Sequence, residues 1–235
     1  MPYLIICGEK TDYAHVLYRK AIGKYDALNF GIRFVPKDTD LVVLNDADTE
    51  IFGFKNALKQ LEDKTIGLVF SKVVVKTGPQ KTFYLFLDKL RSKIPIAASG
   101  ELMIIRYKLL NKILPVKPCK AEDSYLLFKT LEFGYKINFC EKSFVVTERT
   151  KNGEDEVNYK RRTTTGLYQA LSYTKPPAIV KLFYILLPLV SPLLLATGRK
   201  GYCWMNGIHL GFIDFLRGDN KGYWEDVSEL TRAVE

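Results

Sequence analysis

The sequence predicts an α/β domain with a mainly parallel sheet flanked by helices, followed by an apolar C-terminal helical region. Up to about Gly134, short apolar runs rich in β-branched residues alternate with helical patterns. The run LVVL at residues 41–44 is uninterrupted, as expected of a buried strand whose two faces are covered by helices. After Gly134 the composition changes, first to a charged segment and then to two apolar stretches. This change indicates a second kind of region.

The individual elements follow from the periodicity of the apolar residues. We expect strands at residues 3–7, 41–45, 66–70 and 135–139. Helical patterns occupy residues 14–22, 25–32, 54–61, 82–90, 108–113 and 124–133. The charged segment at residues 147–165 is typical of a loop that leads into a helix.

Length and charge limit the classes of protein. With 235 residues, 47% of them hydrophobic, the chain can bury one substantial core. We therefore expect one domain over residues 1–174 and a membrane-associated region over residues 175–235. The net charge of +9 favours an anionic partner, whether nucleic acid, an anionic membrane surface or a phosphorylated substrate. The four cysteines form no CxxC pair, which indicates reduced, cytosol-facing thiols rather than a zinc site or a disulfide framework.

The tail contains two apolar stretches separated by Arg199 and Lys200. The first has about sixteen apolar residues after Lys181, fewer than the ~20 that a straight helix needs to span a bilayer. Pro188 and Pro192 would kink it. A membrane-embedded hairpin, an in-plane helix and a soluble core helix all fit this pattern. We favour membrane contact, because Lys, Arg, Tyr and Trp flank both stretches as in interfacial anchors.

Two carboxylates, Asp46 and Asp48, directly follow the strand predicted at residues 41–45. In open α/β sheets, ligands bind at the carboxyl ends of the strands. Residues two apart in an extended chain point the same way, so this pair suits a divalent metal that bridges the oxygens of a diphosphate. The alternative is a solvated turn with an Asx cap before the next helix.

Two other segments accompany this acidic pair. The segment GKYDALNFG at residues 23–31 has the pattern of a helix with a glycine exit. Glu122 and Asp123 head a predicted helix, where carboxylates complement the helix dipole. Each segment alone has an ordinary structural explanation.

In this order and spacing, the segments resemble the family 2 glycosyltransferases with the GT-A fold, which include polyprenol-phosphate sugar synthases and cellulose-synthase-like enzymes. The resemblance covers residues 7–171 and implies a GT-A-like, Rossmann-like fold. The matching pieces are GKYDALNFG for GKxxALNxG, LVVLNDADTE for the strand with DxD, ASGELMIIRYKLL for the acceptor-side strand, EDSYLLFKTLEFGYKINF for the ED-headed helix, and YKRRTTTG where many members have QxxRW.

The resemblance assigns residues to the donor. Asp46 and Asp48 would hold Mg²⁺ or Mn²⁺ against the donor diphosphate, with Asp46 also contacting the donor. Lys24 and Asn29, in the GKxxALNxG element, are further donor-binding residues. Arg161 and Arg162 would clamp the departing phosphates, since guanidinium forks suit phosphate geometry. The alternative for these two arginines is a solvated basic patch that faces anionic lipid.

The resemblance also assigns residues to the acceptor. Asp123 would be the general base that takes the proton from the acceptor hydroxyl, so that one in-line displacement inverts the anomeric centre. Ser99, Gly100 and Glu122 lie on the acceptor side, and Glu122 is more suited to orienting the helix terminus than to proton transfer.

Two departures from the family pattern affect the expected activity. The QxxRW window keeps its arginine but replaces the glutamine and the tryptophan, which favours single-sugar transfer over processive synthesis. The chain also begins at what resembles the second strand of the family, so the usual first β-α unit has no counterpart in this sequence.

These observations predict an inverting, metal-dependent glycosyltransferase at the cytoplasmic face of the cell membrane. It would use a nucleotide-diphosphate sugar and a lipid-linked or glycan acceptor. The alternative is a catalytically silent GT-A-like module that binds a membrane or a partner. Nucleic-acid binding ranks last, because the aromatic residues are not interleaved with Lys and Arg on a binding element.

Overall fold

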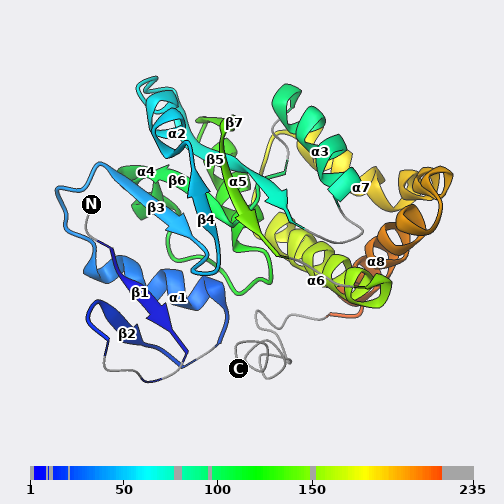
Figure 1. The fold of residues 1–235 in the computed structure, drawn as a ribbon, viewed down its shortest axis with the longest axis horizontal. Helices are drawn as coiled ribbons and strands as arrows, with labels where there is room; N and C mark the ends of the chain where they lie inside the picture. Colours follow the sequence, from blue (N-terminus) through cyan, green and yellow to red (C-terminus); the bar gives the residue numbers. More distant parts are fainter. Residues whose placement is uncertain are drawn as a thin grey trace.

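The computed structural model describes residues 3–8, 10, 13–20, 22–76, 81–94, 97–148 and 152–218. Its main sheet has five strands in the order β3-β6-β5-β7-β4, and a two-stranded ribbon, β1-β2, lies apart from it. Figure 1 shows this ribbon at one end of the molecule and α7 and α8 at the other, with the main sheet between them. The strands are β1 (Ile5–Cys7), β2 (Val16–Tyr18), β3 (Leu41–Asn45), β4 (Glu50–Phe52), β5 (Ile66–Val75), β6 (Leu102–Arg106) and β7 (Lys136–Thr147).

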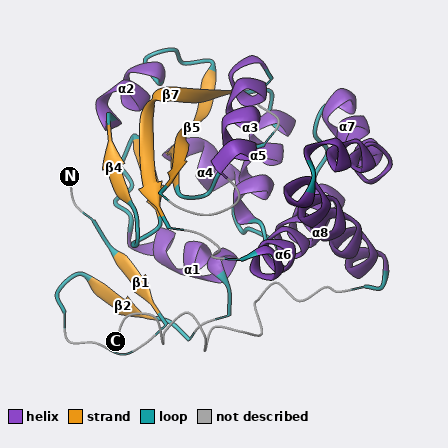
Figure 2. Ribbon diagram, turned by 45° about the vertical axis from the view of Figure 1, so that its right-hand side comes forward, coloured by secondary structure: helices purple, strands orange, loops and turns teal. Residues whose placement is uncertain are grey.

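The helices supply the other layers of the domain. They are α1 (Lys24–Gly31), η1 (Ile32–Phe34), α2 (Phe54–Gln60), α3 (Lys81–Lys93), α4 (Tyr107–Ile113), α5 (Glu122–Glu132), α6 (Gly153–Ser172), α7 (Ala178–Val190), η2 (Ser191–Thr197) and α8 (Arg199–Leu216). Figure 2 shows α2 beside β4 at the top of the sheet and the group α6, α7 and α8 to its right. The mixed α/β class is therefore confirmed.

The predicted mainly parallel sheet is wrong, because the main sheet is mixed. Only β5 and β7 pair in parallel, whereas β3-β6, β6-β5 and β4-β7 are antiparallel. Strands β3, β5 and β7 share one direction, and β6 and β4 run against them. Apolar runs show that a segment is a strand but not which way it enters the sheet. Strand β3 is also an edge strand and only half-buried, although its continuous apolar run predicted cover on both faces.

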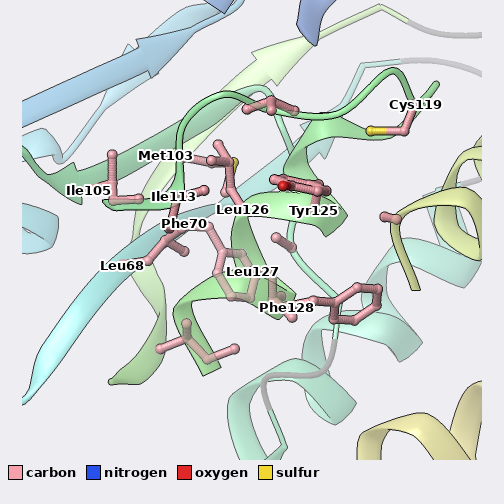
Figure 3. Packing of buried hydrophobic residues seen from close by; sticks show 14 of the residues in the cluster. Leu68, Phe70, Met103, Ile105, Ile113, Cys119, Tyr125, Leu126, Leu127 and Phe128 are labelled. Carbon is pink, nitrogen blue, oxygen red and sulfur yellow. The ribbon is translucent and has the colours of Figure 1, made fainter. Parts of the chain in front are cut away.

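Successive residues of the central strands alternate between two apolar clusters. Leu68 and Met103 belong to the larger cluster, which α4 and α5 cover, and Figure 3 shows this packing. Val69 and Ile104 belong to a smaller cluster on the other face, which contains Ala57 of α2. Both faces of the sheet centre are thus covered by helices, as the pattern of short strands and helices predicts.

The helix predicted at residues 14–22 is wrong, because β2 lies there and pairs in parallel with β1. His15 has a φ of 65°, which lies in the left-handed region and is incompatible with a continuous α-helix. The ribbon contacts α1, since a Cβ at Gly31 would lie 3.3 Å from the side chain of Ile6. The sequence prediction missed β2, and it also missed β4.

The C-terminal helices pack on the domain. Val180 and Tyr184 of α7 belong to the larger apolar cluster, so residues on both sides of the predicted division at residue 174 share one core. Helix α8 crosses α6 closely, because a Cβ at Gly211 would lie 2.3 Å from the backbone oxygen of Arg161. Such a distance leaves room for glycine alone.

One stretch of the described chain, Ala178–Thr197, has the length and apolar composition of a membrane span, with a mean hydropathy of 2.2. It comprises α7, which contains Pro188, and the 3₁₀ turn η2. Only 22% of this stretch is buried in the molecule. Six residues of this stretch form the exposed apolar face, namely Ile179, Leu182, Ile185, Leu186, Leu189 and Leu193.

Candidate functional site

A large cleft, with a volume of about 2900 Å³, runs past the carboxyl end of β3 and the first residues of α1 and α5. Helices α3, α6, α7 and α8 and the strands β1 and β4 also contribute lining residues. Most of the predicted site residues line this cleft. They are Lys24, Asp46, Asp48, Ser99, Gly100, Glu122, Asp123 and Arg162. Asn29 and Arg161 are not among its lining residues.

The pairing of β3 with β6 brings the metal and acceptor segments together. Asn45 pairs with Leu102, so the end of β3 meets the beginning of β6. The backbone N–H of Asp46 continues this ladder by donating to the carbonyl of Glu101, at 3.1 Å. One residue earlier, Gly100 lies against the side chain of Asp123, because a Cβ there would be 3.3 Å from the Asp123 Cβ. Segments far apart in the chain therefore share one corner of the cleft.

Helix α6 positions the first turn of α5. The amide oxygen of Gln169 accepts a hydrogen bond from the backbone N–H of Lys120, at 2.9 Å. A Cβ at Gly166 would lie 2.5 Å from the backbone nitrogen of Ala121, so only glycine allows this approach. Asp123 itself accepts from the N–H of Ser124 at 2.6 Å, and the helix dipole favours a carboxylate in the first turn.

A lysine connects the acidic groups. The Nζ atom of Lys24 lies 2.7 Å from both carboxylate oxygens of Asp46. Burial alone would lower the pKa of Lys24, but Glu122, Asp46 and Asp123 outweigh burial and raise it. One carboxylate that follows β3 and two in the first turn of α5 are therefore within electrostatic reach of one ammonium group.

Burial also shifts the two carboxyls of α5. It raises the pKa of Glu122 to about 7, against the opposing attraction of Lys24. Burial likewise raises the pKa of Asp123, against the hydrogen bond from Ser124 and the attraction of Lys24. A carboxyl with a raised pKa accepts a proton more readily than an ordinary one, which suits a general base.

The residues at the end of β3 fit a divalent cation that arrives with its own oxygen ligands. The described residues contain no group of three or more His, Cys, Asp or Glu side chains able to hold a metal alone. Within the described chain, the exposed Asp48 makes no hydrogen bond or ion pair, and Asp46 already holds a cationic group between its two oxygens. Two hard carboxylate donors plus the oxygens of a diphosphate and water would complete the shell of Mg²⁺ or Mn²⁺.

Two predicted donor residues have other partners. The side-chain amide of Asn29 donates to the carbonyl of Val116 at 2.9 Å and accepts from its N–H at 2.8 Å, which ties α1 to the loop before α5. Arg161 forms a two-point ion pair with Asp214 of α8, at 2.5 and 2.8 Å. Both residues brace the walls of the cleft. Arg162 does line the cleft, and its guanidinium stacks over the ring of Tyr159.

Ser99, one of the predicted acceptor-side residues, also has a structural role, because its buried hydroxyl donates to the carbonyl of Ser71 at 3.2 Å.

Sequence reasoning missed a different residue, Arg91 of α3, which is buried and lines the cleft. The only signal was Asp88 three residues earlier, and that spacing is ordinary on a helix surface.

Comparison with known proteins supports the fold. No protein-family model and no curated protein matches the chain. Among solved structures, it is similar to a mannosyltransferase from Pyrobaculum calidifontis in complex with GDP-Man and Mn²⁺, with a TM-score of 0.65. The two chains are 19% identical, and the match covers 86% of this chain and 69% of the other. The chain thus has the fold of a glycosyltransferase structure.

The raised pKa of Glu122 predicts how stability depends on pH. Between the ordinary carboxyl pKa and about 7, the folded protein binds a proton that the unfolded chain releases, so this carboxyl lowers the unfolding free energy as pH rises. In metal-free buffer, we expect Glu122→Gln to gain melting temperature relative to the parent protein between pH 5 and pH 8.

Glu132 provides the control for this measurement. Its burial is outweighed by Lys129 and by the N–H of Lys175, and its pKa is lowered. It is therefore ionised throughout that range in both states, and the Glu132→Gln difference from the parent should stay constant. A Glu122→Gln difference that is equally flat would contradict the raised pKa.

Proposed function

We propose that the protein is a glycosyltransferase that moves a sugar from a nucleotide-diphosphate sugar to an acceptor held in the cleft. The observation that carries this proposal is the convergence of Asp46, Glu122 and Asp123 around Lys24 in one cleft. The similarity in fold to a structure that contains GDP-Man and Mn²⁺ supports it. The resemblance to family 2 supplies the finer expectation of an inverting enzyme.

In this proposal Asp123 is the general base. Its raised pKa keeps it basic enough to take the proton from an acceptor hydroxyl as that oxygen attacks the anomeric carbon. The attack comes from the face opposite the nucleotide, so a single displacement inverts the centre. Gly100 leaves open the space beside the carboxylate, because a side chain there would contact Asp123.

Asp46 and Asp48 would hold the divalent cation, Mg²⁺ or Mn²⁺. When bound, the cation offsets the charge that develops on the departing diphosphate. Lys24 and Arg162 place further positive charge on the same cleft and so favour an anionic donor. Before the donor binds, the ammonium of Lys24 neutralises Asp46, which keeps a half-buried carboxylate paired.

The exposed apolar face supports a second part of the proposal, namely that the protein works at the cytoplasmic face of the cell membrane. Leu189 and Leu193 are 74% and 78% exposed, and contiguous apolar surface of this kind is rare on soluble monomers. Lys175 and Lys181 on one side, and Arg199 and Lys200 on the other, supply positive charge for anionic headgroups. Because α7 also packs Val180 and Tyr184 into the core, we propose that it lies in the membrane plane.

One observation favours the silent-module alternative, because Lys24 occupies both oxygens of a proposed metal ligand. The two functions differ in donor binding. We expect purified protein to bind a GDP- or UDP-sugar in calorimetry only when Mn²⁺ or Mg²⁺ is present. Asp48→Ala should weaken this binding at least about tenfold, since it removes a charged metal ligand.

Asp38→Ala is the matched control, because Asp38 is exposed and does not line the cleft. Its donor affinity should equal that of the parent. If no nucleotide sugar binds with metal present, the result favours the alternative of a catalytically silent module. The metal assignment fails if Asp48→Ala binds as tightly as the parent.

The role of Asp123 predicts a separation of binding from chemistry. Asp123→Asn keeps the shape of the side chain but removes its basicity, so sugar transfer should fall by about 10²–10⁴-fold while metal-dependent donor binding remains. Glu122→Gln should reduce transfer much less. Equal losses in the two variants would assign the base role to the carboxyl pair rather than to Asp123.

The proposed membrane contact is tested by flotation with vesicles that contain anionic lipid. The double variant Leu189→Asp, Leu193→Asp places two charges on the exposed apolar face and should abolish co-flotation. Ile51→Asp changes an exposed apolar residue of β4, far from α7 in Figure 1, and should float like the parent. Parent protein that stays wholly in the soluble fraction would overturn this part of the proposal.

A further inference from the structure

The ion pair between Lys24 and Asp46 occupies one of the two proposed metal ligands. The Nζ atom of Lys24 lies 2.7 Å from both carboxylate oxygens of Asp46, where a cation bound by both oxygens would also lie. Within the described chain, Asp48 makes no hydrogen bond or ion pair. A divalent cation can therefore contact Asp48 directly, but it competes with an ammonium group for Asp46.

The pair lies where it can open. The side chain of Lys24 is 51% exposed and that of Asp46 is 27% exposed. Both residues line the cleft, so a ligand that enters the cleft meets the pair. Because an ion pair open to solvent contributes little to folding stability, the ammonium group can exchange Asp46 for another anion without disturbing the core.

The charges of the corner explain why the lysine stands in for a metal ion. Partial desolvation would lower the pKa of Lys24, but the attraction of the nearby carboxylates outweighs it and raises the pKa. These carboxylates are Glu122, Asp46 and Asp123. The protonated lysine is thus attracted to the same groups that attract a divalent cation, and its charge repels a cation that approaches Asp46.

A diphosphate supplies an anion that can take the ammonium group from Asp46. Its oxygens bind a divalent cation, and lysine ammonium groups are common ligands of phosphate. When the diphosphate arrives with the cation, the ammonium can move to a phosphate oxygen while the cation contacts Asp46. Each charge keeps a partner in this exchange, which is favourable because an unpaired charge in a partly desolvated site is costly.

We propose that Lys24 couples metal binding to donor binding. In the free protein its ammonium group excludes a divalent cation from Asp46, and the diphosphate of the donor releases Asp46 by binding the ammonium. The site then holds the cation and the donor tightly only when both are present. An occupied Asp46 is therefore a property of the donor-free protein. The exclusion of the cation stands on the ion pair itself, whereas its release by a donor rests on the proposed function.

Binding of Mn²⁺ alone tests the exclusion without any donor. The electron paramagnetic resonance signal of free Mn²⁺ falls on binding, so a titration of the full chain gives its affinity. We expect the parent to bind Mn²⁺ weakly and Lys24→Gln to bind it at least about tenfold more tightly, because a repelling charge beside the ligand is removed. Lys24→Arg keeps that charge and should bind Mn²⁺ like the parent.

Lys76→Gln is the matched control. Lys76 also lines the cleft, but its Nζ atom pairs with Glu50, at 3.6 Å, instead of Asp46. Its Mn²⁺ affinity should equal that of the parent, and a gain as large as that of Lys24→Gln would reduce the effect to general charge. Unchanged affinity in Lys24→Gln, or an equal gain in Lys24→Arg, would overturn the proposed competition.

Binding of nucleoside diphosphates tests the release of Asp46. Calorimetry would measure GDP and UDP with and without Mn²⁺, corrected for the Mn²⁺–nucleotide complex that forms in solution. By linkage, the factor by which Mn²⁺ raises nucleotide affinity equals the factor by which the nucleotide raises Mn²⁺ affinity. This factor should be at least about tenfold smaller in Lys24→Gln, whose metal site is open without the nucleotide. An equal factor in the two proteins would contradict the coupling.

If Lys24→Gln does not fold, nuclear magnetic resonance of the parent decides. With ¹³C at the Cε atoms of the lysines, the Lys24 signal is assigned by its absence from Lys24→Arg. Diamagnetic Mg²⁺ should leave this signal in place when added alone and shift it when added with GDP or UDP. A shift with Mg²⁺ alone would contradict the exclusion, and a bound nucleotide without a shift would contradict the release.

The two affinities separate this inference from the proposed function. If Lys24→Gln gains Mn²⁺ affinity but the parent binds no nucleotide or nucleotide sugar, the exclusion of the cation stands and the glycosyltransferase proposal fails. If the parent binds a nucleotide sugar with metal but Lys24→Gln gains no Mn²⁺ affinity, the proposed function stands and the inference about Lys24 fails.

Discussion

The ion pair between Lys24 and Asp46 is the contact on which the candidate site depends. Three carboxylates lie near this corner of the cleft, and burying like charges together is costly unless a cation compensates them. Lys24 supplies that cation from the first residue of α1, while the β3-β6 register and Gly100 bring Asp46 beside Asp123. Without the ammonium group, mutual repulsion would force these carboxylates apart or leave them protonated.

Sequence reasoning succeeded where the determinants are local. Asp46 and Asp48 follow a strand because LVVLN has a strong strand pattern, and Asp123 heads a helix because its first turn is acidic. It failed where long-range pairing decides. No periodicity shows that β6 enters antiparallel between β3 and β5, or that the amide of Asn29 is bound by Val116, 87 residues away.

Arg91 illustrates a second limit of sequence reasoning. In the sequence, Asp88 and Arg91 resemble an ordinary surface pair, because three-residue spacing on a helix is common. The structure instead buries both, and among the described residues no hydrogen-bond partner reaches Asp88 Oδ1 and Oδ2 or Arg91 Nε and Nη1. Helix α3 packs on β5 and β7, and Asp88 lies beside Lys72 of β5. The signal therefore appears only when these segments, which are distant in the sequence, are packed together.

The cleft thus joins two surfaces of opposite character. The corner that contains Asp46, Glu122, Asp123 and Lys24 is charged, and the proposed function assigns the metal and the donor diphosphate to it. Toward α3 and α7 the cleft becomes apolar, with Arg91 as the one buried charge among the cleft-lining residues described on those two helices. Asp123 lies between these surfaces. A ligand with both a charged and an apolar part would match this change of environment along the cleft, whereas a wholly polar ligand would leave the apolar wall unused.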